Sequence, residues 1–390
     1  MFERTLNPSK INSFILFGAR GTGKSTYVIE HYVTQKTLFF DLLNPEEEAR
    51  LLKSPQYLIE RMHGAGPGLR RVVIDEVQKL PKLLDLVHQQ IEGSKREGHP
   101  LQFILLGSSA RKLRRGAANL LAGRAFVYYL FPLTHREIGP SFDLTAILQY
   151  GSLPAVFSYD TPVDKRLFLE AYARTYLKEE IWNEQIIRKL EPFALFLEVA
   201  AQGNGKILNF SKIGRDIGTD TKTVQSYYQI LEDTLAGFLL PAYHRSVRKR
   251  QTTAPKFYFC DTGVKRALDG TLTVNLLPQT YAYGDAFEHF IILEIARLCA
   301  YRGNNYRFSY FRTHEDAEVD LIVERPGQPP VLIEIKSAEY VDPMEVKSLE
   351  RIANDFGPCE GICLSRDQHK RKVGKVLIAP WQEGMQHIGL

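Results

Sequence analysis

The sequence predicts a multidomain α/β protein: a parallel-sheet unit with a phosphate-binding loop and a helical lid, a winged helix-turn-helix, and a second α/β unit. Four short apolar runs, at 14–17, 37–40, 71–74 and 103–106, alternate with helical segments. A glycine-rich loop follows the first run, and apolar strands return after residue 300. Continuous apolar runs separated by helices are typical of parallel strands covered on both faces.

Composition limits the class of protein before any motif is considered. The chain has 390 residues, which at about 150 residues per domain favours two or three folded units. Its four cysteines form no CxxC pair, no apolar stretch reaches the ~18 residues that cross a bilayer, and the first residues lack a signal-peptide core. We therefore expect a soluble, cytoplasmic protein without a membrane partner. The net charge of +5 is too small to indicate a partner by itself.

The segment 18–25 reads GARGTGKS and stands between the apolar run 14–17 and a helical pattern from Ser25 to Val33. Glycines in such a loop let backbone N–H groups converge on phosphates, the lysine reaches the β and γ oxygens, and the hydroxyl binds Mg²⁺. The sequence therefore predicts a site for ATP with Mg²⁺. We expect it to comprise Gly18, Gly21, Thr22, Gly23, Lys24, Ser25 and Thr26.

Two acidic residues, Asp75 and Glu76, end the apolar run 71–74. In a phosphate-loop protein the first acid at this place holds the metal, and the second orients and polarises the attacking water. We expect Ser25 and Asp75 to bind Mg²⁺ and Glu76 to be catalytic. The second acid favours hydrolysis over phosphoryl transfer to a small molecule.

Ser108 and Arg124 complete the expected catalytic set with Lys24. Ser108 follows the run 103–106, where its hydroxyl would lie beside the γ-phosphate. The order of motifs resembles AAA+ ATPases, in which an arginine ahead of the next strand reaches the nucleotide of a neighbouring subunit. The resemblance implies that Arg124 is this arginine finger, which stabilises transition-state charge. Arg114 and Arg115 compete for the role, and the alternative is that all three lie on a solvated basic face.

Residues 144–203 have mostly helical apolar spacing and are predicted to form a helical lid or connector. In 210–233 two short helical patterns flank Gly218, which indicates a helix-turn-helix, and the segment that follows favours a β-ribbon with a basic tip. The expected DNA contacts are Lys222, Thr223, Gln225, Arg245, Arg248, Lys249 and Arg250. The alternatives are a packing module and ordinary solvated charges, as for the basic clusters at 111–115 and 369–375.

Acidic residues mark two successive apolar strands near the C-terminus, Asp320 in the first and Glu334 in the second, with Lys336 two positions later. A further acid, Glu288, lies in the preceding helical pattern. Acids on neighbouring strands with a nearby lysine can bind one or two Mg²⁺ or Mn²⁺ ions and activate water against a phosphodiester. The set resembles the PD-(D/E)xK nuclease core. Such cores are also reused as inactive binding platforms, so cleavage and binding stay as alternatives.

Taken in order, many segments of the chain resemble one family of prokaryotic AAA+ ATPases, the AAA_14 type with a DUF4143 C-terminal region. They include GARGTGKST, VVIDEVQKLP, LLGSSARKL, FPLTHREI, YGSLPAV, KFYFCDTGVKRAL, GDAFEHFIILEI and LIEIKSA. The resemblance implies an ATPase domain, a winged helix and a restriction-endonuclease-like domain. We expect an ATPase core over 1–143, a helical connector over 144–203, a winged helix over 204–260 and a nuclease-like domain over 261–390.

The leading hypothesis is an Mg²⁺-dependent ATPase that forms a homo-oligomeric, hexameric ring and remodels or translocates DNA. Forked or four-way DNA is a special case by analogy with the bacterial Holliday-junction motor. One alternative is an ATP-gated nuclease that uses a second Mg²⁺ or Mn²⁺ site at the C-terminal carboxylates. Another is an ATP-switched regulator or defence component that binds DNA or protein and whose nuclease fold is inactive.

Overall fold

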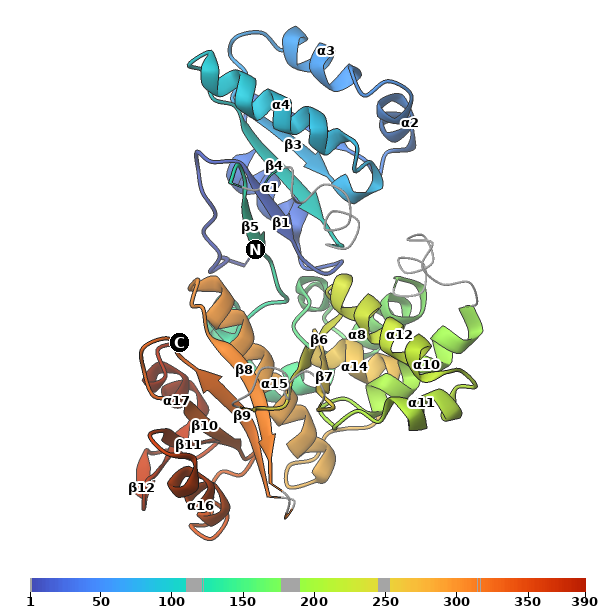
Figure 1. The fold of residues 1–390 in the computed structure, drawn as a ribbon. Coiled ribbons are helices and arrows are strands. Elements are labelled where there is room, and N and C mark those ends of the chain that lie inside the picture. The colour runs from blue at the N-terminus through green and yellow to red at the C-terminus, as the bar shows by residue number, and fades with distance from the viewer. Residues whose placement is uncertain are drawn as a thin grey trace. The chain divides into compact units, whose positions relative to one another are not determined.

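The computed structural model describes residues 2–109, 121, 123–176, 190–244, 253–313, 315 and 317–390. The chain divides into two compact units (Figure 1). One spans residues 3–132 with 233–236, and the other contains Phe2, residues 133–232 and residues 237–390. The boundaries predicted at 143/144, 203/204 and 260/261 stay predictions.

The first unit is built on a parallel five-stranded sheet in the order β2-β3-β4-β1-β5, as the apolar runs predicted. All six residues of β4 and all four of β1 are buried, which explains their continuous apolar character. Because β1, β3 and β4 are adjacent and parallel, the loops that follow them meet at one edge of the sheet. The strands are β1 (Phe14–Phe17), β2 (Thr37–Asp41), β3 (Arg71–Asp75), β4 (Gln102–Gly107) and β5 (Phe126–Tyr129).

Helices of the same unit bury an apolar face against this sheet, so that Leu84 and Val87 of one helix join Ile74 and Leu105 of the strands in one core. A 3-10 turn over Val77–Lys79 directly follows β3. The helices are α1 (Lys24–Tyr32), α2 (Pro45–Lys53), α3 (Tyr57–Gly64) and α4 (Leu83–Arg96).

The second unit begins with the predominantly helical region that the sequence predicted. Its helices are α6 (His135–Ile138), α7 (Leu144–Tyr150), α8 (Pro162–Ala171), α10 (Leu190–Gln202), α11 (Phe210–Asp216), α12 (Thr221–Asp233) and α14 (Thr262–Leu268). Shorter helical turns cover Gly139–Ser141, Pro154–Ser158 and Tyr172–Tyr176.

Helices α11 and α12 form the predicted helix-turn-helix. Gly218 has φ 69°, and a Cβ at Gly214 would stand 2.8 Å from the Thr219 carbonyl oxygen, so the turn needs glycine at both places. Asn209 and Asp220 cap the two helices with side-chain oxygens. Strands β6 (Gly237–Leu240) and β7 (Lys256–Phe259) then pair antiparallel as a ribbon. The predicted basic tip at 244–250 lies outside the described residues except for His244.

The C-terminal part contains a mixed six-stranded sheet in the order β12-β13-β11-β10-β9-β8. Helices α15 and α17 contribute to one apolar core against the sheet and α16 to another. The strands are β8 (Arg307–Arg312), β9 (Glu318–Glu324), β10 (Val331–Ile335), β11 (Glu360–Ser365), β12 (Arg371–Val373) and β13 (Val376–Pro380). The helices are α15 (Tyr281–Tyr301), α16 (Lys347–Phe356) and α17 (Trp381–His387). The molecule is thus a multidomain α/β protein, as predicted.

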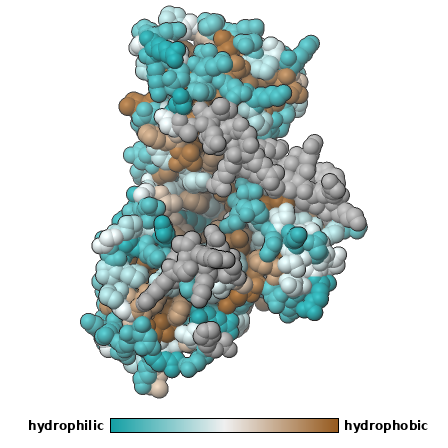
Figure 2. All heavy atoms as spheres, viewed as in Figure 1, coloured by the Kyte–Doolittle hydropathy of each residue, from teal (hydrophilic) through white to brown (hydrophobic). Residues whose placement is uncertain are grey.

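Hydrophilic residues predominate on the face drawn in Figure 2, and apolar residues form small groups between them. Within the described ranges, no helix combines the length and the apolar character that a membrane span requires.

Candidate active site

The loop between β1 and α1 needs its glycines for backbone reasons. Gly21 and Gly23 have φ of 79° and 88°, in the left-handed region that side chains disfavour. A Cβ at Gly18 would stand 2.4 Å from the Leu130 carbonyl oxygen and 2.8 Å from Thr22 Oγ1. The loop therefore packs so closely that any larger residue at Gly18 would displace it.

Lys24 lies inside this loop. Its side chain is buried, and Nζ donates hydrogen bonds to the carbonyl oxygens of Gly18 at 2.7 Å and Ala19 at 3.3 Å. Thr22 Oγ1 donates to the same Ala19 oxygen at 2.8 Å, whereas Thr26 is exposed on the first turn of α1. The structure thus brings Gly18, Thr22 and the lysine ammonium together.

Ser25 and Asp75, the predicted metal ligands, are in direct contact. Ser25 Oγ donates to Asp75 Oδ2 at 2.5 Å, and the backbone N–H of Glu76 donates to Asp75 Oδ1 at 2.9 Å. Burial raises the pKa of Asp75, and the Ser25 hydrogen bond opposes that rise. A hydroxyl from the first turn of α1 and a carboxylate from the end of β3 therefore meet beside the lysine.

Glu76 and Ser108 are also brought together. Glu76 has φ 55°, and its Oε2 accepts a hydrogen bond from Ser108 Oγ at 3.0 Å. Gln78 Nε2 donates to both groups, to the Glu76 carboxylate at short range and to Ser108 Oγ at 2.8 Å. The sequence analysis did not identify Gln78, because its return toward Glu76 depends on the 3-10 turn after β3.

A second residue that the sequence analysis missed is Arg4. Its guanidinium donates to the carbonyl oxygens of Thr22 at 2.9 Å and Phe131 at 2.6 Å, which fixes the loop from outside. Only the contacts show this role, since Arg4 lies in no recognisable motif.

Arg124, the predicted arginine finger, contacts Glu92 of α4. Its Nε lies 2.8 Å from Glu92 Oε1, and the two side chains are each 34% exposed. This hydrogen bond lowers the pKa of Glu92. The competing candidates Arg114 and Arg115 lie outside the described residues.

One cluster in the C-terminal part of the chain contains the predicted residues Glu288, Asp320, Glu334 and Lys336. Lys336 Nζ lies 2.7 Å from Glu334 Oε1, and Asp320 Oδ2 accepts from the Ile335 N–H at 2.7 Å. Burial raises the pKa of Asp320 well above its usual value, and Glu334 and Glu288 raise it further. Burial likewise raises the pKa of Glu334, against the effect of Lys336.

Lys256 belongs to the same cluster, although the sequence analysis did not include it among the nuclease-like residues. Burial alone would lower its pKa, but Glu288, Glu318 and Asp320 raise it above the usual value. Across the part of the chain that the structure describes, no three or more His, Cys, Asp or Glu side chains are arranged to hold a metal.

The predicted DNA contacts on α12 differ in exposure. Lys222 and Gln225 are exposed near its start, while Thr223 Oγ1 is used in the cap and donates to Asp220 Oδ2 at 2.7 Å. Arg245, Arg248, Lys249 and Arg250 lie outside the described residues.

Comparison with family models assigns three successive regions. An AAA domain of the AAA_14 type matches residues 10–139, and the domain of unknown function DUF4143 matches residues 283–383. The chain carries an AAA_14 domain followed by a DUF4143 domain. Both were predicted from the motifs. A further domain of unknown function, DUF8612, matches residues 141–275 between them.

Two relatives of the chain are distant in sequence. An uncharacterized protein of Mycobacterium tuberculosis is 27% identical over 315 residues, which cover 81% of this chain and 68% of the relative. An uncharacterized protein of Haemophilus influenzae is 22% identical over 308 residues, 73% of this chain and 74% of the relative.

Two solved structures are similar at low TM-scores. The Orc1 protein of Aeropyrum pernix in complex with DNA has 12% identity and a TM-score of 0.29, covering 68% of this chain and 87% of that chain. A single-substitution variant of RuvB from Thermotoga maritima has 17% identity and a TM-score of 0.26, covering 61% of this chain and 83% of that chain. At such scores the similarity decides nothing about function.

Proposed function

We propose that the AAA_14 domain binds and hydrolyses ATP with Mg²⁺. The observation that carries the proposal is the 2.5 Å contact between Ser25 Oγ and Asp75 Oδ2, beside the buried Lys24. Hydroxyl and carboxylate oxygens are the ligands that Mg²⁺ prefers, and the residues present therefore suit this ion.

The loop also suits the phosphates of a nucleotide. Helix α1 begins at Lys24, so the backbone N–H groups of its first turn and the positive end of the helix dipole face the loop. The Lys24 ammonium, now bonded to the Gly18 and Ala19 carbonyl oxygens, can exchange these for phosphate oxygens. Mg²⁺ held by Ser25 and Asp75 would neutralise charge on the phosphates.

Glu76 and Ser108 supply the remaining chemistry in this proposal. The Glu76 carboxylate, held by Ser108 and Gln78, orients a water molecule and accepts its proton as the water oxygen attacks the terminal phosphorus. The bond from that phosphorus to the bridging oxygen breaks, and ADP leaves with the electron pair. Arg124 of an adjacent subunit stabilises the charge that develops on the phosphoryl group, which requires a homo-oligomer, for which we propose a hexameric ring.

We further propose that DNA is the macromolecule on which this ATPase acts, in the cytoplasm. Support comes from the helix-turn-helix of α11 and α12, whose second helix presents the exposed Lys222 and Gln225 at its start, and from the two-stranded ribbon that follows. These groups suit phosphates and base edges.

ATP turnover by the full-length protein tests the proposal. We expect turnover that requires Mg²⁺, is lost in Lys24→Ala, and rises when duplex, forked or four-way DNA is added. Lys206→Ala is the matched control, because it also removes a lysine ammonium with protein partners, here Asp285 at 3.0 Å, but lies in the other unit. Turnover that persists in Lys24→Ala would contradict the ATPase, and turnover indifferent to every DNA form would contradict the DNA motor.

A further inference from the structure

The nuclease-like carboxylates surround a lysine that comes from the ribbon after the helix-turn-helix. Lys256 is the first residue of β7 and its side chain is 3% exposed. Its Nζ lies 2.5 Å from Glu318 Oε1 on β9 and 3.7 Å from Glu288 Oε1 on α15. A buried ammonium is costly unless carboxylates pair with it, and here they do.

The other polar groups of the cluster are also engaged within the protein. Tyr258, two residues along β7 and therefore on the same side of the strand, donates its hydroxyl to Glu288 Oε1 at 2.7 Å. As described above, Glu334 is paired with Lys336, and Asp320 accepts the Ile335 N–H. Each of the three acids expected to hold a metal thus has a protein donor on one of its oxygens.

This arrangement does not fit a divalent metal site. Mg²⁺ and Mn²⁺ require several oxygen ligands converging on one point at about 2.0–2.2 Å. Here Lys256 lies between Glu318 and Glu288, and Lys336 lies against Glu334. A metal would have to displace ammonium groups that already pair with three of the four carboxyl groups, those of Glu288, Glu318 and Glu334.

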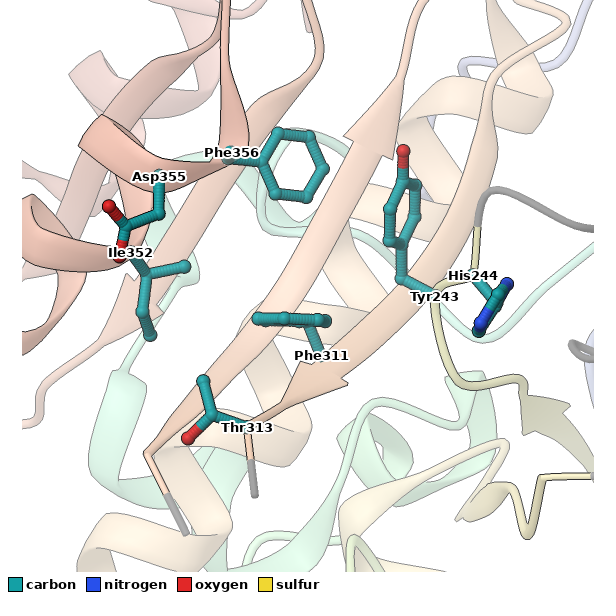
Figure 3. Close-up of a pocket in the computed structure, with 7 residues that line it drawn as sticks. All are labelled: Tyr243, His244, Phe311, Thr313, Ile352, Asp355 and Phe356. Carbon is teal, nitrogen blue, oxygen red and sulfur yellow. The ribbon is translucent and has the colours of Figure 1, made fainter. Parts of the chain in front are cut away.

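The ribbon that supplies Lys256 is tied to the C-terminal sheet at other points too. The Tyr243 N–H donates to the Tyr310 carbonyl oxygen at 2.6 Å, and the Tyr310 hydroxyl donates to the Ala254 carbonyl oxygen at 2.5 Å. Figure 3 shows the Tyr243 ring with Phe311 of β8 and Phe356 of α16, and the centroids of the Tyr243 and Phe356 rings are 4.9 Å apart. Hydrogen bonds to backbone groups, aromatic contacts and the buried lysine thus all connect the ribbon segment with the C-terminal sheet and its helix α16.

We propose that Lys256 takes the place of the divalent cation at the nuclease-like centre. The carboxylates bind this lysine instead of Mg²⁺ or Mn²⁺, the centre does not cleave DNA, and its structural role is to hold β7 of the ribbon against the C-terminal sheet. The nuclease fold is thereby used as an anchor for the segment next to the helix-turn-helix. The proposal does not depend on ATP hydrolysis.

The test measures Mn²⁺ binding to the full chain by electron paramagnetic resonance. All proteins carry Asp75→Asn, which disables the nucleotide metal site. The parent protein should show no Asp320-dependent site tighter than about 1 mM. Lys256→Ala should gain one site, at least about tenfold tighter, that disappears when Asp320→Asn is added. Lys206→Ala, which removes a lysine from the separate Asp285 pair, should gain none.

Either of two Mn²⁺-binding results would overturn the proposal: an Mn²⁺ site in the parent that Asp320→Asn removes, or a folded Lys256→Ala protein that gains no site. The first result compares the parent with its Asp320→Asn variant and therefore does not depend on a lysine variant that folds. If Lys256→Ala does not fold, Lys256→Gln, which keeps a polar side chain of similar length, replaces it in the Mn²⁺-binding measurement. In either lysine variant, hydrogen exchange at residues 256–259 should be faster than in Lys206→Ala, and equal exchange would contradict the anchor. Cleavage of supercoiled DNA that Asp320→Ala and Lys336→Ala both abolish would also overturn the proposal.

Discussion

Replacing Gln78 with leucine should slow ATP hydrolysis without weakening ATP binding. Gln78 is 6% exposed, and its Nε2 donates to both the Glu76 carboxylate and Ser108 Oγ. Leucine fills nearly the same volume but removes this donor, so that of the two donors to the Glu76 carboxylate among the described residues, Ser108 remains. Gln78 therefore acts as a positioning residue, through Glu76.

The magnitude follows from the kind of bond that is lost. A hydrogen bond to a charged group contributes about 1.5–3 kcal/mol, and if that energy fixes Glu76 for reaction, kcat should fall about 10- to 100-fold. KM for ATP should change less than about threefold, because no atom of the 18–25 loop is altered.

Steady-state ATP hydrolysis over a range of ATP concentrations separates kcat from KM. Gln149→Leu is the matched control, since Gln149 is also 6% exposed and donates to two carbonyl oxygens, those of Leu272 and Val274, but lies in the second unit. A kcat of Gln78→Leu that equals or exceeds that of the wild type, or that falls no further than in Gln149→Leu, would contradict a positioning role for Gln78.

Three further predictions concern separate parts of the chain. Burial lowers the pKa of His289 to about 3. The Nε2 of this histidine donates to the Phe259 carbonyl oxygen at 2.7 Å. Between about pH 6.5 and pH 3 the unfolded chain therefore binds a proton that the folded chain does not. The free energy of unfolding should then decrease as the pH is lowered, by up to about 1.4 kcal/mol per pH unit. Urea unfolding should show this slope for the wild type relative to His289→Gln, and identical pH dependences would refute it. Arg124→Ala should retain ATP binding but lose about a thousandfold in kcat, and mixing it with Glu76→Gln should restore turnover, because some interfaces then pair an intact arginine with an intact acid. No recovery on mixing would exclude action across subunits. Lys222→Ala should weaken DNA binding and reduce the slope of log K against log salt by about one, and an unchanged slope would place Lys222 away from phosphate.

The sheet of the first unit was predictable because its strands are buried on both faces. Residues 14–17 were expected as a strand and form β1, and the run 103–106 lies inside β4. The phosphate-loop motif then predicted that a helix begins at its end, and α1 begins at Lys24. Strand order was not predictable, since no local pattern tells which strands become neighbours.

The last strands of the C-terminal sheet were harder to predict, because strand β12 lies within a segment of basic residues. The basic cluster at 369–375 includes β12, and two of its charges pair with acids: Arg371 with Asp367 at 3.2 Å and Lys370 with Glu383 at 3.1 Å. The sequence analysis also missed strand β13 and helix α17, which follow this cluster directly. Strand β12 has the charged sequence RKV and no apolar pattern, whereas β13 is a short apolar run, VLIAP, like those that marked the first sheet, so its pattern was present in the sequence.

The candidate sites were predictable where their residues share a motif. Lys24, Ser25 and Asp75 fall in two short segments whose order indicates the chemistry, and the structure brings them together. Gln78 was missed because a tight turn sets its direction. Lys256 was missed as a member of the acidic cluster because it comes from another element, far from Asp320 in the sequence.

The most direct test of the proposed function is electron microscopy of the Glu76→Gln protein with Mg²⁺, ATP and DNA. The variant should bind ATP but not hydrolyse it, which traps the assembly. We predict ATP in the 18–25 loop with Mg²⁺ at Ser25 and Asp75, Arg124 of the adjacent subunit at the terminal phosphate, and DNA against α12. A nucleotide site elsewhere, or a monomer that binds neither ATP nor DNA, would contradict the proposal.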